Sequence, residues 1–245
     1  MKKIILSLTM LTMAFSTQAQ KIEIGVNAGL YTTWLMNKNV FDQNDIINHA
    51  FSGGPNFGFL ATFNMSEKVG IGLELNFATV HQKYSGDYGF ATYEAKETIH
   101  YTEIPILFKL KSEGGFYFEI GPKISLRGKA TEEFTSDPSN PADYSSLNIE
   151  KGFKSTVVSI VFGFGGRFDL SDHLALTAGL RLAASLGDAT EEYSQDELNN
   201  TDLEEEIGIA DGFAHRKSNG DFKYVKTTLA TGGLQMGLVY MLGDK

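Results

Sequence analysis

Cysteine is absent from the 245 residues of this chain. Its absence excludes disulfides, thiolate metal sites and a lipid anchor attached to a cysteine behind a leader peptide. Small exported domains often depend on disulfides for their stability. An exported chain of this composition therefore needs another source of stability. Closure of a β-sheet on itself is one, because it pairs every backbone group and leaves no edge.

Long apolar stretches and an excess of basic residues are also missing. After the first twenty residues, no stretch approaches the ~18 apolar residues of a transmembrane helix. The 21 Lys and Arg are outnumbered by 30 Asp and Glu, which gives a net charge of −9. Nucleic-acid binding requires a basic stripe, so we expect no nucleic-acid partner. We also expect no cofactor, since Gly163, Gly165 and Gly166 lie in an alternating stretch that no helix follows, unlike a phosphate-binding loop.

The N-terminus has the layout of a secretory signal peptide. Lys2 and Lys3 precede a short, mostly apolar stretch, and the small residues Thr17 and Ala19 stand at positions −3 and −1 of a cleavage site. The apolar stretch is too short to cross a bilayer comfortably. We therefore predict a cleaved signal peptide over residues 1–19, in preference to a buried N-terminal helix. Loss of its two lysines changes the net charge from −9 to −11.

The remaining residues, 20–245, form one predicted domain in which hydrophobic residues recur with a period of two. In segment 115–129, one set of alternate residues is apolar and the other is polar or small. Strict alternation over this length predicts a β-strand longer than most strands of soluble sheets. We predict eight strands, at residues 21–35, 54–65, 69–83, 92–111, 115–129, 153–169, 172–187 and 221–242.

The connections between these segments alternate between short and long. The short ones lie near 66–68, 112–114 and 170–172, and the long ones at 36–53, 84–91, 130–152 and 188–220. Outer membrane barrels have short periplasmic turns and longer outer loops. The predicted fold is therefore all-β: an eight-stranded antiparallel up-and-down transmembrane β-barrel with short periplasmic turns and long extracellular loops, located in the outer membrane.

We predict that the polar face of the strands lines the inside of the barrel. It is rich in small residues and carries isolated charges of both signs, which suits the narrow lumen of eight strands. Aromatic residues gather toward the strand ends, as they do at membrane interfaces. A soluble, lipocalin-like barrel with the apolar face inside is the alternative. The charges on the polar face are Glu23, Glu74, Glu103, Glu119, Lys123, Arg127, Arg167 and Arg181.

We interpret most of these charges as a cross-lumen network that plugs the barrel. A buried carboxylate in so narrow a space needs a cationic partner. A proton or ion path through the lumen is the alternative. The predicted network comprises Glu74, Glu103, Glu119, Lys123, Arg127, Arg167 and Arg181.

A distinctive string spans the fourth and fifth predicted strands: YTEIPILFKLK, a tight SEGG turn, and FYFEIGP. It resembles the PorT-like outer membrane β-barrel family of Bacteroidetes, and the matching residues are Tyr101, Glu103, Ile104, Pro105, Lys109, Tyr117, Gly121 and Pro122. The resemblance implies an eight-stranded barrel. The founding member is associated with export of secreted proteases, but no secretion-specific site is present in these motifs, so that role is not carried over. Physically, Pro105 lacks an N–H and predicts a bulge or bend.

The chain end adds a second, weaker resemblance. In MGLVYML, Gly237, Tyr240 and Leu242 resemble the signal by which the barrel assembly machinery recognises its substrates. Leu242 stands where the final aromatic residue is usual, and three residues follow it. We therefore expect the barrel assembly machinery to be a partner during insertion.

The loop 188–220 is strongly acidic. Between Asp188 and Asp211 it holds ten acidic residues and no Lys or Arg. Carboxylates at this density suit Ca²⁺ or Mg²⁺, and the weak candidates for ligands are Asp202, Glu204, Glu205 and Glu206. Their spacing matches no dedicated calcium loop, and blocks of like charge are usually solvated. We therefore predict a hydrated, partly helical loop without a metal site.

Two histidines suggest an enzyme as an alternative. His81 and His100 lie toward the outer ends of paired strands, with Ser85 and Asp87 close behind His81. A histidine with Ser or Asp near the outer rim is the arrangement of a lipid-modifying acyltransferase or esterase. No Gly-x-Ser-x-Gly signature is present, however.

The sequence as a whole favours a non-enzymatic integral outer membrane barrel with a plugged or narrow lumen and no catalytic residues. We expect a binding, adhesion or structural role, or an accessory role in an envelope complex, exercised through the loops 130–152 and 188–220. The expected partners are outer membrane lipids and a protein or glycan ligand at the outer loops. The alternatives are a lipid-modifying enzyme and a narrow channel.

Overall fold

The computed structural model describes residues 21–138, 143–199 and 206–242. The predicted signal peptide lies outside them. The long strands in these ranges are β1 (Lys21–Met36), β3 (Gly53–Asn64), β4 (Val69–Asp87), β5 (Thr92–Lys111), β6 (Phe116–Asp137), β8 (Thr156–Asp169), β9 (Leu174–Ser185) and β10 (Thr228–Leu242). Two short strands, β2 (Asn48–Ala50) and β7 (Tyr144–Asn148), join the same sheet. The described helices are all short: α2 (Lys38–Phe41), η1 (Asn44–Ile46), η2 (Glu150–Gly152), α3 (Gln195–Leu198) and α5 (Ile209–Ala214).

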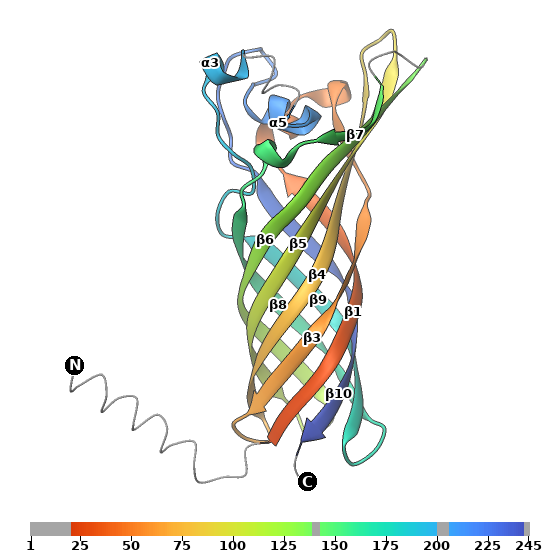
Figure 1. Ribbon diagram of the computed structural model, residues 1–245, viewed down its shortest axis with the longest axis vertical. Coiled ribbons are helices and arrows are strands. Elements are labelled where there is room, and N and C mark those ends of the chain that lie inside the picture. Colours follow the sequence, from red (N-terminus) through yellow and green to blue (C-terminus); the bar gives the residue numbers. More distant parts are fainter. Residues whose placement is uncertain (1–20, 139–142, 200–205, 243–245) are drawn as a thin grey trace, which may run out of the picture.

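The strands pair antiparallel around a tube (Figure 1). The order is β2-β4-β3-β1-β10-β9-β8-β6-β5, and β4 also pairs with β5, so the pairing returns to its starting point. Ile22 pairs with Leu242, which places the start of β1 beside the end of β10 at the end of the tube that carries the short turns. The long connections and all the short helices lie at the opposite end. No helix within the described ranges is both long and apolar enough to cross a bilayer.

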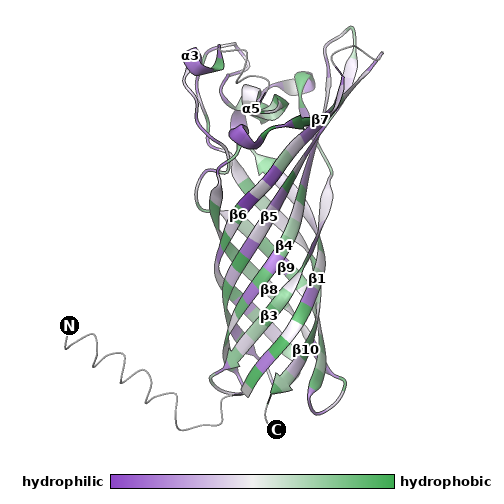
Figure 2. Cartoon of the chain, in the orientation of Figure 1, coloured by the Kyte–Doolittle hydropathy of each residue, from purple (hydrophilic) through white to green (hydrophobic). Residues whose placement is uncertain are grey.

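The outer wall of the tube is apolar. Large side chains that a soluble protein would bury are exposed there, among them Phe116 at 72%, Leu30 at 71% and Leu234 at 65%. Residues of contrasting hydropathy alternate along the strands (Figure 2), as expected for two faces in different solvents. The apolar face therefore points outward, and the lipocalin-like alternative, which needs it inside, is wrong.

Several predicted boundaries were wrong at the loop end. The strand predicted to end at residue 129 continues to Asp137, and the one predicted to end at 83 continues to Asp87. Conversely, the last strand begins at Thr228, not at residue 221. The sheet has ten strands, where eight were predicted, because β2 and β7 pair with the extensions of β4 and β6. In these extensions apolar residues such as Tyr84 and Phe134 face inward and the outward residues are polar, so the alternation that marks the wall reverses and does not reveal them.

The bulge between β5 and β6 lies in β6, away from the place predicted at Pro105: Ile99 pairs with Ala130 and Tyr101 with Arg127, so β6 carries one extra residue there. The β5–β6 register is continuous across Pro105, which pairs with Lys123, and it shifts between Ile99 and Tyr101. Gly121 lies on β6, two residues before Lys123, and its surroundings explain why the resembling motif has glycine there. A Cβ at Gly121 would lie 1.9 Å from the carbonyl oxygen of Ile106, so any larger residue would push the two strands apart.

Candidate functional site

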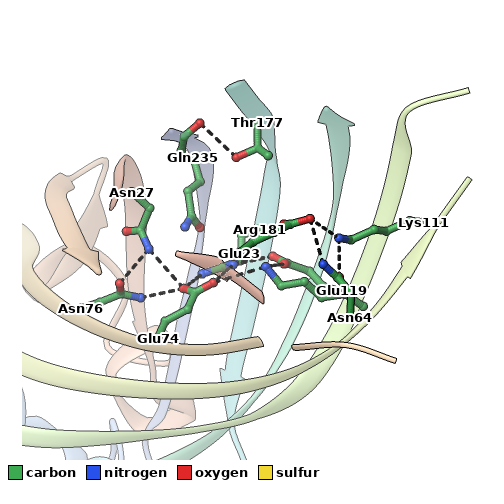
Figure 3. Close-up of polar contacts among 12 residues, drawn as sticks. Glu23, Asn27, Asn64, Glu74, Asn76, Lys111, Glu119, Thr177, Arg181 and Gln235 are labelled. Atoms are coloured by element: carbon green, nitrogen blue, oxygen red, sulfur yellow. Dashed lines mark hydrogen bonds and ion pairs between the residues drawn. The ribbon is translucent and has the colours of Figure 1, made fainter. Parts of the chain in front are cut away.

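The centre of the lumen holds an arginine between two carboxylates (Figure 3). Arg181 of β9 binds Glu74 of β4 through both oxygens, with Nη1–Oε2 and Nη2–Oε1 distances of 2.7 and 2.9 Å. Its Nε and Nη2 lie 2.8 and 2.6 Å from Oε1 of Glu119 on β6. Lys109 Nζ completes the group at 3.4 Å from Glu119 Oε2 and 3.8 Å from Glu74 Oε1. We call Arg181, Glu74, Glu119 and Lys109 the central cluster.

Two further ion-pair groups flank the central cluster along the lumen. Glu23 Oε1 lies 2.9 Å from Lys111 Nζ and 3.0 Å from Arg167 Nη1. Lys123 Nζ lies 2.5 Å from Glu103 Oε1. Neutral amides extend the network, because Asn27 donates to Asn76 and Asn76 donates to Glu74. The buried charges of the lumen are therefore compensated by neighbouring charges and amides, as burial in a narrow space requires.

Strand geometry makes room for the central cluster. A Cβ at Gly163 would lie 2.6 Å from Oε1 of Glu119, so glycine at this inward position leaves space for the carboxylate. Gly165 and Gly179 likewise stand beside the hydroxyl of Tyr117, 2.6 Å from their hypothetical Cβ positions. These glycines accommodate side chains of β6, the adjacent strand, where Glu119 pairs with Gly163 and Tyr117 with Gly165.

The structure brings together most, though not all, of the predicted network. Glu74, Glu119 and Arg181 meet, whereas Glu103 and Lys123 form a separate pair and Arg167 binds Glu23. The placement of Arg127 in the lumen network was wrong. Its guanidinium donates to the carbonyl of Gly128 and lies 3.6 Å from Glu150, so it bonds at the loop end and not with the lumen network.

Two cations of the network were missed in the sequence. Lys109 was noted only as part of the family motif, and Lys111 was not singled out. Both are in phase with Glu103 on β5, so the period-two alternation that placed Glu103 inside also places them there. The remaining motif residues Ile104 and Pro122 face outward, while Tyr101 is buried at 2% exposure.

An apolar layer closes the lumen on the loop side of the ion pairs. Leu35, Ile99, Phe153, Val157 and Leu229 pack there, each at most 2% exposed. Between this layer and the central cluster, a cavity of about 30 Å³ touches Tyr31, Glu103, Lys123 and Arg181. That volume holds about one water. Toward the short turns the lumen widens into a cavity of about 820 Å³ that Lys111 and Arg167 help to line.

Above the apolar layer, the long loops form a hydrogen-bonded cap. The amide of Asn39 donates to the carbonyls of Ala214 and Lys223, at 2.9 and 2.6 Å. The amide of Asn37 donates to Thr227 Oγ1 at 2.9 Å. Both asparagines are buried. These bonds join the loop after β1 to the loop before β10, which are far apart in the sequence.

A buried histidine organises the second half of the cap. His215 is fully buried, and its Nε2 accepts the backbone N–H of Tyr193 at 3.0 Å. The rings of Tyr193, Phe222 and Tyr224 lie within 6.2 Å of its ring. Tyr224 in turn donates to Asp188. The loop predicted as hydrated therefore contains a packed interior.

Two carboxylates lie buried beneath helix α5. Glu97 and Glu132 are directly opposite each other on β5 and β6, and both are fully buried. Glu132 accepts the backbone N–H of Ile209 at 3.0 and 3.2 Å and the hydroxyl of Tyr144. Burial raises the pKa of Glu132 above its ordinary value of 4.5. The first residue of α5 thus rests on a carboxylate.

The histidines of the enzyme alternative point to threonines. His81 Nδ1 lies 3.0 Å from Thr98 Oγ1, and His100 Nδ1 lies 3.2 Å from Thr79 Oγ1. Neither pair involves Ser85 or Asp87. Among the described residues, no group of three or more His, Cys, Asp or Glu is placed to hold a metal.

Of the four weak candidates for metal ligands, one lies among the described residues. Asp202, Glu204 and Glu205 lie outside the described residues. Glu206 forms an ion pair with Lys151.

Comparison with known families decides the class of protein. The family model described as the outer membrane protein β-barrel domain matches residues 18–191. The chain belongs to this family. It is therefore an outer membrane β-barrel protein, in agreement with the apolar outer wall. No curated protein matches the chain.

Several solved outer membrane proteins are also similar to this chain. OprG from Pseudomonas aeruginosa is 10% identical, with 93% of this chain and 98% of that one covered and a TM-score of 0.46. AlkL, solved in lipid bilayers, is 12% identical, with 91% and 90% covered and a TM-score of 0.45. Ail from Yersinia pestis, solved with a heparin analogue, is 10% identical, with 90% and 99% covered and a TM-score of 0.38.

Proposed function

We propose that this protein is a non-enzymatic, non-conducting barrel that binds a protein or glycan ligand through its extracellular cap. The eight long strands would cross the membrane, while β2 and β7 belong to the part above it. The proposal includes export by the signal peptide 1–19. The PorT-like resemblance fits this architecture and carries no secretion role into the proposal.

The occupied lumen argues against a channel. The central cluster and the pair Glu103–Lys123 cross the lumen, and the apolar layer lies next to them. An ion that passed would have to separate buried ion pairs and then enter an apolar layer, and each step is unfavourable. Because the apolar layer is separate from the central cluster, loss of the cluster alone would not open the lumen.

The packed interior of the cap is the observation that carries the proposal. Loops that serve only as a solvated shield need no buried polar residues, yet Asn37, Asn39 and His215 are buried and hydrogen-bonded there. A cross-linked set of loops presents a fixed surface, and a preorganised surface loses less entropy when a ligand binds.

The tips of the extended strands offer the contact surface. Phe90, between β4 and β5, is 82% exposed, and its ring lies 6.1 Å from that of Tyr88. An open groove of about 590 Å³ runs beside this tip and is lined by Asp45, Asp87 and Glu94, among others. Exposed aromatic rings next to polar and acidic groups are suited to contact with proteins and sugars.

Binding of fluorescent nanodiscs that carry the protein to a glycan array and to immobilised extracellular proteins tests the proposal. We expect Tyr88→Ala/Phe90→Ala to lose at least tenfold in affinity, since aromatic anchors dominate interface energies. The matched control is Phe51→Ala, which removes an aromatic ring that is 76% exposed on another loop at the same end. Equal binding by both variants, or no bound ligand at all, would contradict the proposal.

Two measurements address the alternatives. Single-channel current in planar bilayers would favour the channel. A change in the lipid profile of the membrane on expression, abolished by His81→Ala or His100→Ala, would favour the lipid-modifying enzyme. We expect neither current nor a changed lipid profile.

A further inference from the structure

The apolar side chains of the outer wall form a band around the barrel, which we call the apolar belt. On β4, β5 and β6 the outward side chains beyond this belt are no longer apolar. The belt reaches Phe77 on β4 and Leu126 on β6, which are 38% and 43% exposed. Beyond Phe77 the inward residues Ala78, Val80 and Gln82 are buried, so the intervening residues face outward. On this part of the wall the outward residues are polar or charged.

Five cationic or titratable side chains gather on this part of the wall, and we call them the basic patch: His81, Lys83, Lys96, His100 and Lys129. Lys83 and Lys96 are directly opposite each other in the β4–β5 register. His81 is opposite Thr98, and His100 is opposite Thr79, so the two histidines are diagonal neighbours. Lys129 is exposed, at the bulge that faces His100.

This arrangement is unfavourable without an anion. Like charges directly opposite each other on two strands destabilise the pair. Lys96 has one carboxylate partner, Glu133 at 3.6 Å, and both side chains are well exposed to solvent. In the described part of the chain, Lys83 and Lys129 lie within ion-pair distance of no carboxylate. Glu94, two residues from Lys96, is the other acidic residue on the outward face of β5 here.

The patch is confined to one side of the barrel. At the loop ends of β1, β9 and β10 the outward residues are Trp34, Leu186 and Ala230. Leu186 is 63% exposed. The exposed Lys226, just before β10, donates to the carbonyl of Leu186 and stands alone there among the described residues, whereas the cations of β4 to β6 are grouped.

The lower part of the patch lies at the height of the lipid headgroups, because His100 is opposite Thr79, only two residues beyond Phe77 and about 5 Å above the belt. Lys83 lies six residues beyond Phe77, which is about 20 Å along a strand at ~3.3 Å per residue. A strand tilt of about 40° reduces this to roughly 15 Å above the belt. His81 lies lower, and lysine side chains extend toward the interface from above. The headgroup layer is about 5–8 Å thick on each face of the bilayer. His100 and Lys129 therefore lie at its height, and Lys83 and Lys96 lie above it with side chains long enough to extend down toward it.

We propose that the basic patch binds the phosphate-bearing headgroup of an outer-leaflet lipid. The acyl chains of that lipid would lie on the apolar wall below, on Phe77 and its neighbours, and the phosphates would lie between Lys83, Lys96 and Lys129. The two histidines would add charge when protonated. This site is separate from the ligand surface proposed for the loop tips.

Native mass spectrometry of the folded protein with defined lipids tests the proposal. We expect phosphatidylglycerol to bind better than phosphatidylcholine, and bisphosphorylated lipid A better than lipid A whose phosphates have been removed. The preference should fall with salt, since exposed ion pairs are screened. Equal binding of lipid A with and without phosphates would refute the proposal, and this comparison needs no variant.

A charge-matched pair of variants locates the site. Lys83→Gln/Lys96→Gln/Lys129→Gln removes three charges from the patch, whereas Lys38→Gln/Lys217→Gln/Lys223→Gln removes three exposed charges from the cap. With about a twofold preference per exposed ion pair, the first variant should lose roughly tenfold selectivity for anionic lipid, and the second should keep it. Equal loss in both variants would mean that total charge, not this patch, attracts the lipid.

Discussion

Replacement of Arg181 by methionine should be one of the most damaging single substitutions in the barrel. The substitution keeps an unbranched side chain and removes the cation that serves both Glu74 and Glu119. Removal of one partner from a buried ion pair costs about 3–5 kcal/mol, because the other charge stays buried without compensation. Lys109 lies within 3.8 Å of both carboxylates and offsets part of the cost. We therefore expect the free energy of unfolding to fall by about 3 kcal/mol, the lower end of that range.

Two companion variants separate the cause from a packing effect. Arg181→Met/Glu74→Gln/Glu119→Gln removes the two carboxylates as well and should recover most of the loss, since replacement of a whole buried ion group is often close to neutral. Arg127→Met is the matched control. Its arginine is paired at 3.6 Å with the partly exposed Glu150, so its loss should cost about 1 kcal/mol or less.

The assay is urea unfolding of protein folded into detergent micelles. The single tryptophan, Trp34, lies on the outer wall and reports unfolding by fluorescence. The gel-mobility difference between boiled and unboiled samples provides an independent measure of the folded fraction. If Arg181→Met costs no more than Arg127→Met, or if the triple variant is worse than Arg181→Met, the central cluster does not hold the barrel together as argued.

Three further predictions concern other parts of the chain. The raised pKa of Glu132 means that its contribution to stability is complete below the unfolded value of 4.5 and is lost as pH rises through the folded value. Hydrogen exchange at Ile209, corrected for the intrinsic effect of pH, should therefore quicken with rising pH, and Glu132→Gln should abolish this dependence; an unchanged slope in the variant would assign it to another group. Gly163→Val should destabilise the barrel by about 1–3 kcal/mol, because the new side chain would overlap Glu119. Gly187→Val should cost little, because nothing lies within 4 Å of that position. Similar urea midpoints for the two variants would count against the crowding argument. Mass spectrometry of protein from the outer membrane should find an N-terminus at Gln20, and an intact Met1 would refute cleavage of the signal peptide.

The local pattern of the sequence is sufficient for the wall of the barrel. Alternate residues of a strand point to opposite faces, so the apolar set identifies the outer wall and places Glu74, Glu103 and Glu119 inside. The same alternation, applied to all of β5, also identifies Lys109 and Lys111. Short and long connections indicate which end carries the loops.

Tertiary structure alone decided which inward charges meet and what the loops form. Arg181 lies 107 residues from Glu74 and 62 from Glu119, and their contact depends on strand order and register around the tube. Arg127 is in phase with Glu119 and Lys123 on β6, yet it lies beside Glu150 at the loop end, and no local signal marks this difference. The cap depends on bonds such as Asn39 to Lys223, which join segments that are distant in sequence. A periodic pattern encodes the two faces of a strand, because solvent on each side selects residue type locally; it does not encode the partner across the lumen, because that choice depends on closure of the whole sheet.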